Sequence, residues 1–114
     1  MSPVKADESW GPTHLIARGQ IERAVDRAVA LDVVERVLAE QSRGRVAMPA
    51  KVTMNLAEFG LNAWNTAMPA YSESLGASGF KWVGGFGDDR RDHGLPFLIA
   101  MILVQDANTG YRWR

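Results

Sequence analysis

A lysine inside a short aromatic segment is the residue of this chain best suited to do chemistry. Lys81 stands between Phe80 and Trp82 in a run of aromatic and branched residues that is typical of a β-strand. Because side chains alternate between the two faces of a strand, Lys81 and Val83 point away from the face that carries the aromatic rings. The spacing leaves two roles open for the ammonium group. It is solvated, as most lysines are, or it binds an anion.

A second group of reactive residues follows this strand, where acids and a histidine surround two arginines. Carboxylates and imidazole are suitable metal ligands. The arginines neutralise the acids, however, so we interpret the segment as a solvated loop tip and expect no metal site. Its residues are Asp88, Asp89, Arg90, Arg91, Asp92 and His93.

Three glycines, Gly84, Gly85 and Gly87, lie directly after the strand. Glycine can take positive φ or let another group approach the backbone closely, so we expect an accessible loop here. The segment lacks the third glycine and the following helix of a dinucleotide fingerprint. We therefore expect no cofactor to be bound by this chain alone.

Two helices and four strands are predicted to position these residues. Apolar residues at helical spacing predict helices over residues 20–28 and 32–42, the second with Asp32 as its N-cap and with Gly44 after its end. Alternation predicts a strand over residues 51–56, with Lys51, Thr53 and Asn55 on its polar face. Further strands are predicted over residues 62–68, 80–85 and 97–105.

The boundaries of the later strands follow from local chemistry. Pro69 is predicted to end the second strand, because proline cannot donate to a sheet ladder. Residues 97–104 are apolar throughout, which favours a central strand buried on both faces. A turn is predicted from Asp106 to Gly110, followed by an antiparallel partner strand that begins at Tyr111.

These elements predict an α+β fold, with two N-terminal helices packed on a mostly antiparallel or mixed open sheet. Residues 1–14 are expected to be a loosely ordered lead-in, and residues 15–114 to form the domain. A chain of 114 residues could bury roughly 65% of its unfolded surface, which is enough for a modest single core.

Composition excludes several classes of function. The 13 basic and 13 acidic residues cancel, which removes the attraction that drives binding to nucleic acid or to anionic membranes, so neither partner is expected. With no cysteine there is no disulfide, thiolate nucleophile or cysteine metal site. Residues 1–10 lack the apolar segment of a secretory signal, and we expect a cytoplasmic protein.

Several short motifs, in this order, resemble the N-terminal domain of the ornithine cyclodeaminase/mu-crystallin family. No single motif is specific, but their order and spacing together are. The resemblance covers most of the chain, from about Leu15, and members of the family are much longer. The motifs are Met48-Pro49-x-Lys51, Met68-Pro69-x-Tyr71, the strand lysine Lys81, Gly94-Leu95-Pro96 and Asp106-x-x-Thr109-Gly110.

The resemblance implies a role for three residues. Lys81 and Lys51 would bind the α-carboxylate of an amino-acid, keto-acid or imino-acid ligand, and Met68 would line the substrate pocket. A methionine there is also compatible with plain core packing. We therefore expect the ammonium of Lys81 to lie in a hollow sized for a small zwitterion.

The resemblance also implies partners and a cofactor. Two copies of the domain would join their sheets into a barrel-like homodimer core. NAD(P) would serve the complete enzyme, held by a Rossmann domain that is absent from this chain or supplied as a separate chain. In the complete cyclodeaminase, hydride leaves the substrate Cα for NAD, the side-chain amine attacks the imine, ammonia is lost, and hydride returns to give proline. This chain alone is expected to be inactive.

Some residues depart from the pattern of the family. Thr66 stands where certain members have a carboxylate that meets a distal amine of the substrate, so ornithine is an unexpected substrate. Lys51 replaces a frequent arginine, which predicts a looser grip on a carboxylate. Gly87 and Asp89 replace the proline and asparagine of the loop. A non-catalytic amino-acid-binding or scaffold protein derived from the family, or one piece of a split enzyme, stays open as an alternative.

Overall fold

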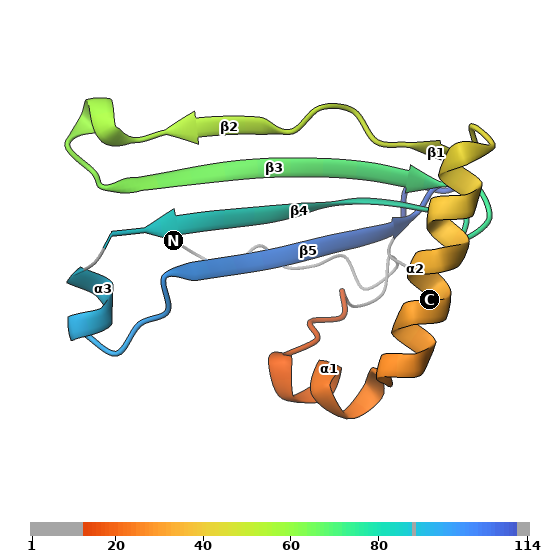
Figure 1. Ribbon diagram of the computed structural model, residues 1–114, viewed down its shortest axis with the longest axis horizontal. Helices are drawn as coiled ribbons and strands as arrows, with labels where there is room; N and C mark the ends of the chain where they lie inside the picture. Colours follow the sequence, from red (N-terminus) through yellow and green to blue (C-terminus); the bar gives the residue numbers. More distant parts are fainter. Residues whose placement is uncertain (1–12, 88, 112–114) are drawn as a thin grey trace. The chain divides into compact units, whose positions relative to one another are not determined.

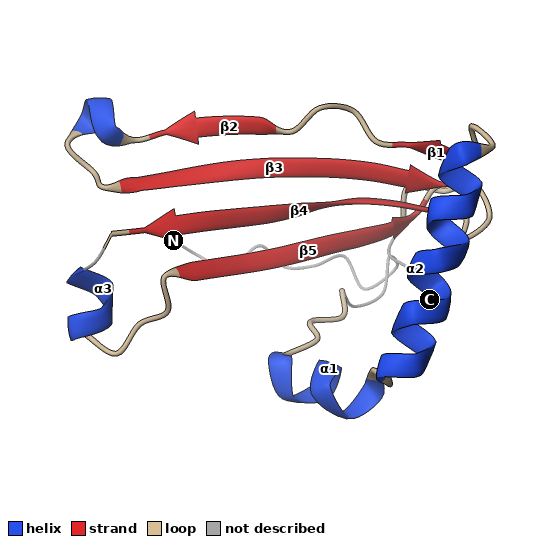
Figure 2. Ribbon diagram, in the orientation of Figure 1, coloured by secondary structure: helices blue, strands red, loops and turns tan. Residues whose placement is uncertain are grey.

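The computed structural model describes residues 13–87 and 89–111, and the chain divides into two units after Glu35. The described part contains three α-helices, a short 3-10 helix and five strands (Figures 1 and 2). This arrangement confirms the predicted α+β class. No described helix is long and apolar enough to cross a membrane.

Helices α1 (Arg18–Ala24) and α2 (Arg27–Ser42) lie at the N-terminal end of the described chain. The predicted helix over residues 20–28 is wrong, because Val25 has extended backbone (φ −96°, ψ 114°) and interrupts it. Asp26 then caps the start of α2, since its Oδ1 accepts a hydrogen bond from the backbone N–H of Ala28 at 2.7 Å. The N-cap expected at Asp32 is therefore wrong as well.

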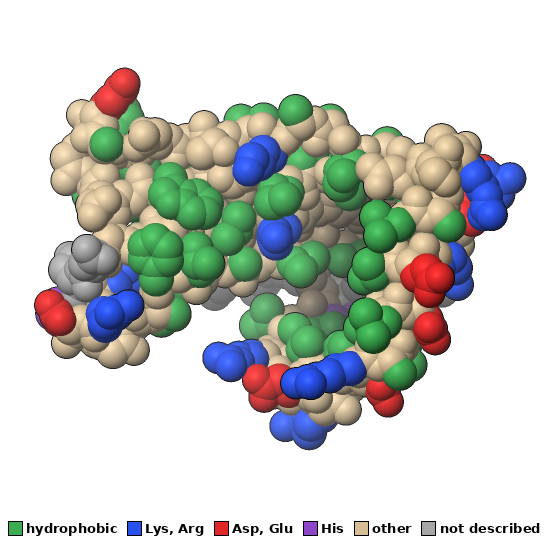
Figure 3. Space-filling view, in the orientation of Figure 1, with side chains coloured by type: hydrophobic (Ala, Val, Ile, Leu, Met, Phe, Trp, Pro, Cys, Tyr) green, Lys and Arg blue, Asp and Glu red, His purple; other side chains and the backbone are tan. Residues whose placement is uncertain are grey.

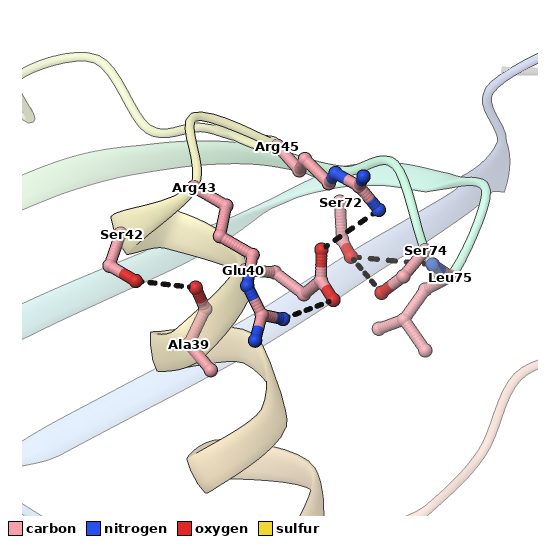
Figure 4. Close-up of polar contacts among 8 residues, drawn as sticks. All are labelled: Ala39, Glu40, Ser42, Arg43, Arg45, Ser72, Ser74 and Leu75. Atoms are coloured by element: carbon pink, nitrogen blue, oxygen red, sulfur yellow. Dashed lines mark hydrogen bonds and ion pairs between the residues drawn. The ribbon is translucent and has the colours of Figure 1, made fainter.

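A buried carboxylate fixes the end of α2 within the second unit (Figure 4). The Glu40 Oε1 atom lies 3.4 Å from Arg43 Nη1, and Oε2 lies 3.9 Å from Arg45 Nη1. The Glu40 carbonyl also accepts the backbone N–H groups of Arg43 and Arg45, and Glu73 N–H donates to the Arg45 carbonyl at 3.0 Å. These bonds join the helix end to the turn after β3, and Gly44, with φ of 73°, allows the reversal.

The sheet is open, and every strand pair in it is antiparallel. Its order is β1-β3-β4-β5, and β2 pairs with β3 on the same edge as β1 (Figure 1). The ten-residue strands β3 and β4 form a long hairpin that carries the central part of the sheet. The strands are β1 (Val46–Ala47), β2 (Val52–Asn55), β3 (Ala63–Ser72), β4 (Ala77–Phe86) and β5 (Leu98–Asp106).

Strand β3 runs through Pro69, so the prediction that this proline ends the strand is wrong. The Ala63 carbonyl accepts a hydrogen bond from Leu56 N–H, and Glu73 N–H donates to the Arg45 carbonyl. The odd-numbered residues of β3 therefore direct their backbone N–H and C=O groups toward β2 and β1. The Pro69 nitrogen therefore faces the interval between β2 and β1. The register also shifts by one residue across that interval. No ladder hydrogen bond is lost at this proline.

Strand β5 lies at the edge of the described sheet rather than at its centre. It pairs with β4 on one side, and the apolar residues Leu98 to Val104 are all exposed. The predicted central strand buried on both faces is therefore wrong. The turn from Asp106 to Gly110 is confirmed, because Gly110 N–H donates to the Asp106 carbonyl at 2.9 Å. The predicted partner strand falls mainly on residues 112–114, outside the described residues.

No apolar side chain is buried among the described residues. Figure 3 shows green apolar side chains uncovered over the visible face of the sheet, with blue basic side chains among them. The predicted single core is thus not formed by the described part of this chain. A sheet layer without a core is stable only when other protein surface covers it.

Candidate functional site

The register of the sheet sets two of the three predicted site residues opposite each other, and the third directly precedes a neighbouring strand. Met68 on β3 and Lys81 on β4 are paired directly opposite each other, so their side chains emerge on the same face. Val52 pairs with Ala67. Lys51 directly precedes β2, and the same register extended by one residue would set it opposite Met68, on the other side from Lys81. We call Lys51, Met68 and Lys81 the lysine row.

The two lysines lie on segments that are two strand spacings apart. Strands lie about 4.8 Å apart, so the Lys51 and Lys81 backbones are separated by roughly 10 Å. Lys51 is exposed and Lys81 is half-buried. Within the described part of the chain, neither ammonium group has an ion-pair or hydrogen-bond partner. A carboxylate between them would offset the repulsion of two like charges.

Two threonine hydroxyls, whose contact the sequence does not reveal, lie beside this row. Thr53 on β2 is paired with Thr66 on β3, and their Oγ1 atoms are 2.9 Å apart. Thr66 is buried, with 4% of its surface exposed, whereas Thr53 is exposed. The alternation over residues 51–56 already predicted that Thr53 lies on the same face as Lys51. The partner of its hydroxyl, thirteen residues away, was not visible in the sequence.

The opposite face of the sheet carries two apolar hollows. One hollow is lined by Pro69, Phe80, Trp82 and Leu103 among others, and the other lies against Trp82 and Phe86. Alternation sets these residues on the face away from Lys81. Neither hollow is lined by Lys51, Met68 or Lys81, so neither is the hollow that was expected at the Lys81 ammonium. The lysine row and the apolar hollows thus occupy different faces.

The glycine segment is covered by side chains on and next to the neighbouring strand β3 rather than open to a ligand. Gly84 and Gly85 belong to β4, and neither they nor Gly87 have positive φ. A Cβ added to Gly85 would lie 2.4 Å from the indole ring of Trp64, and one on Gly87 would lie 2.5 Å from the Asn62 amide. The expectation of an accessible loop is therefore wrong. The glycines make room for these side chains.

The acidic segment after β4 contains helix α3 (Asp89–Asp92), a single turn that was expected to be loop. The Arg90 guanidinium stacks over the Phe86 ring, with 4.2 Å from Cζ to the ring centroid. Among the described residues, no cluster of three or more acidic or histidine side chains could hold a metal ion. Asp88 lies outside those residues.

The described residues do not have the form of a dinucleotide site. The glycine segment is followed by a helix of four residues, and all described strand pairs are antiparallel. A dinucleotide fold needs parallel strands joined by a crossover helix, with the pyrophosphate at the N-terminus of that helix. No chemical step is therefore assigned to a cofactor held by these residues.

Comparison with known proteins gives consistent matches. The sequence pattern of the ornithine cyclodeaminase/mu-crystallin family matches residues 13–113. The alanine dehydrogenase of Archaeoglobus fulgidus is 27% identical over 99 residues, which make up 87% of this chain and 29% of that protein. The chain thus spans less than a third of the length of this relative.

Two solved structures share the fold. An archaeal alanine dehydrogenase dimer with bound NAD has a TM-score of 0.74 and 26% identity, covering 83% of this chain and 28% of its own. The Δ1-pyrroline-2-carboxylate reductase of Thermococcus litoralis, in complex with NADH and L-proline, has a TM-score of 0.76 and 26% identity. That match covers 84% of this chain and 29% of the reductase.

Proposed function

The chain belongs to the ornithine cyclodeaminase/mu-crystallin family, and from this premise we propose that it is the substrate-binding and dimerisation domain of an NAD(P)-dependent amino-acid or imine oxidoreductase. The observation that carries the proposal is the pairing of Met68 with Lys81 on one face of the sheet, beside the strand that directly follows Lys51. Two solved relatives with this fold are described with NAD or NADH, one of them also with L-proline.

The proposed work of this domain is to hold and orient a small carboxylate ligand. Lys81, fixed in the middle of the β3–β4 hairpin, binds the α-carboxylate, and Lys51 binds it from the other side of Met68. The thioether of Met68, which is 38% exposed, forms the apolar floor between the two ammonium groups. Holding the carboxylate at two points orients the Cα–H bond toward an incoming nicotinamide.

The cofactor is proposed to be held by a dinucleotide-binding domain outside residues 1–114. That domain would belong to the same polypeptide or to a separate one. The chain covers 28% and 29% of its solved relatives. That second domain would also cover the lysine face and so enclose the ligand. In this proposal NAD(P) supplies the hydride chemistry, and residues 1–114 alone do not catalyse the reaction.

The proposed oligomer is a homodimer formed through the apolar face. Phe80, Trp82 and Leu103 lie on the face opposite the lysine row, and no apolar side chain of the described part is buried. A second copy seated on this face would remove the exposed apolar surface from water. One solved relative is described as a dimer, which supports a second copy as the occupant.

The test uses the complete protein, meaning this domain together with its dinucleotide-binding domain. Calorimetric titration with L-alanine, L-proline and pyruvate is followed by an assay of NADH oxidation with pyruvate and ammonia. We expect saturable binding of at least one ligand, and NADH oxidation only when the second domain is present. Binding without turnover would support a non-catalytic amino-acid-binding protein instead. Binding of none of the three would overturn the proposal.

A further inference from the structure

We propose that residues 48–51, which connect β1 to β2 and end in Lys51, form a strap that closes onto β3 when a carboxylate ligand binds. In the structure the strap lies off the ladder of β3. Closing would extend the β2–β3 ladder by two residues and bring Lys51 opposite Met68. This inference rests on the proposed function of the lysine row and adds the way in which that site closes.

The strap makes no hydrogen bond with any described residue, although it lies between two paired segments. Ala47 pairs with Tyr71 on one side of it, and Val52 pairs with Ala67 on the other. All four strap residues are exposed. Figure 1 shows the chain between β1 and β2 arching away from β3. The strap is therefore held at its two ends only.

The sequence of the strap and of the facing strand explains this gap. Pro49 in the strap and Pro69 in β3 both lack the N–H group that a ladder bond needs. The register also shifts by one residue between the two flanking pairs, so residues 48–51 face only residues 68–70 of β3. The strap thus contains one residue more than a regular ladder can pair, and this slack lets it stand away from the sheet.

The closed arrangement follows from the register of β2. Extended by two residues, that register sets Lys51 opposite Met68 and Ala50 opposite Pro69. Odd-numbered residues of β3 direct their backbone groups toward this edge, so the Pro69 carbonyl can accept a hydrogen bond from Ala50 N–H. The other two strap residues would then oppose Ala70 as a β-bulge, and β1 would keep its present pairing.

Charge links closure of the strap to the ligand. Closure brings the ammonium of Lys51 toward that of Lys81, and neither has a described acidic partner. Like charges repel, and one hydrogen bond does not offset the conformational entropy of fixing four residues, so the strap stays open on its own. A carboxylate between the ammonium groups turns repulsion into attraction. Lys81 is fixed in the β3–β4 hairpin, so Lys51 is the group that moves.

Amide hydrogen exchange of the complete protein tests the closure. Exchange is followed by mass spectrometry with and without saturating L-alanine, L-proline or pyruvate. We expect one amide in the segment 46–52 to exchange at least about tenfold more slowly with a bound ligand, because Ala50 N–H joins the ladder. Residues 56–61, beyond the other end of β2, should exchange at the same rate in both conditions. Equal slowing of both segments would indicate general stabilisation and overturn the inference.

Two variants should change the affinity for L-alanine in opposite directions. Pro69→Ala supplies an N–H that can donate to the Ala50 carbonyl in the closed strap, so it should lower the Kd by roughly threefold to tenfold, the range of one net hydrogen bond. Ala50→Pro removes the N–H that closure would use and should raise the Kd by a similar factor. Pro96→Ala, at an exposed position outside the strands, is the matched control and should bind as the wild type does.

The outcomes separate this inference from the proposed function. The inference is overturned, and the proposed function stands, if a ligand binds while exchange over residues 46–52 is unchanged. Wild-type affinity in folded Pro69→Ala and Ala50→Pro proteins, or equal tightening by Pro69→Ala and Pro96→Ala, overturns it in the same way. If none of the three ligands binds to the wild-type protein, both proposals fail.

Discussion

Met68 and Lys81 stand directly opposite each other in the ladder of the two longest strands, β3 and β4. Opposed residues of an antiparallel pair have Cβ atoms about 5 Å apart and share a face. Ten consecutive residue pairs join these strands, so the position of the ammonium group relative to the thioether is set by the hairpin rather than by a loop. A binding residue on such an element is held more precisely than one on a mobile segment.

Replacing Lys51 by arginine should tighten ligand binding. The planar guanidinium donates two parallel hydrogen bonds to a carboxylate, whereas an ammonium acts as a point charge. We expect Lys51→Arg to lower the Kd for L-alanine by roughly threefold to tenfold, the range of about one ordinary net hydrogen bond. Calorimetric titration of the complete protein checks this prediction. A weaker complex in the folded variant would show that position 51 lies outside the carboxylate site.

The two faces of β5 allow a matched test of the dimer. Leu103 pairs with Phe80 on the apolar face, and Ile102 pairs with Lys81 on the other. Leu103→Asp should dissociate the dimer, because it buries a charge in the proposed interface. Ile102→Asp should leave it intact. Sedimentation velocity at micromolar concentration measures both. A monomeric wild-type protein, or equal dissociation by both variants, would contradict the proposed interface.

Removing the Glu40 carboxylate should loosen the end of α2. Glu40 is 9% exposed and lies 3.4 Å from Arg43 and 3.9 Å from Arg45, both of which are largely exposed. Solvent screens such pairs, so we expect Glu40→Ala to lower the free energy of unfolding by about 1 kcal/mol. Urea unfolding, monitored by tryptophan fluorescence, measures this change in the free energy of unfolding. Glu58→Ala, at an exposed position in the 3-10 helix Ala57–Phe59, should have no measurable effect.

A methyl group at Gly85 should destabilise the hairpin. The added Cβ would lie 2.4 Å from the Trp64 indole, which must then move, at a cost of roughly 1–3 kcal/mol. Gly19→Ala in helix α1 is the control, because among the described residues its Cβ would have one neighbour within 4 Å, the Arg23 guanidinium at 3.5 Å. There alanine should be neutral or stabilise by up to about 1 kcal/mol. Equal unfolding curves for wild type and Gly85→Ala would contradict the packing of Trp64 on this glycine.

Local patterns predicted the elements that local forces determine. Alternation around Lys81 and in residues 51–56 identified the strands that carry the lysine row, because period-two patterning needs no tertiary contact. The helix break was missed because the apolar spacing of Ile21, Val25 and Ala28 continues through it. The short-range cap formed by Asp26 overrides that spacing.

Features that depend on pairing could not be predicted. Pro69 is tolerated inside β3 because its nitrogen faces the interval between β2 and β1, which only the register reveals. An apolar segment such as β5 has the same sequence pattern whether its own chain or another protein surface covers it. The exposed position of β5 at the sheet edge was therefore missed. The Thr53–Thr66 bond likewise joins residues whose proximity the sequence does not record.

The role of Lys81 is tested most directly by titrating L-alanine into the complete protein and its Lys81→Met variant. Methionine keeps most of the length of the side chain and removes its charge, so we expect the Kd to rise by roughly tenfold to a hundredfold, the range of a charged hydrogen bond. Arg91→Met, which removes an exposed cation from α3, should bind as the wild type does. Wild-type affinity in a folded Lys81→Met protein would contradict the assignment of Lys81 as the carboxylate-binding residue.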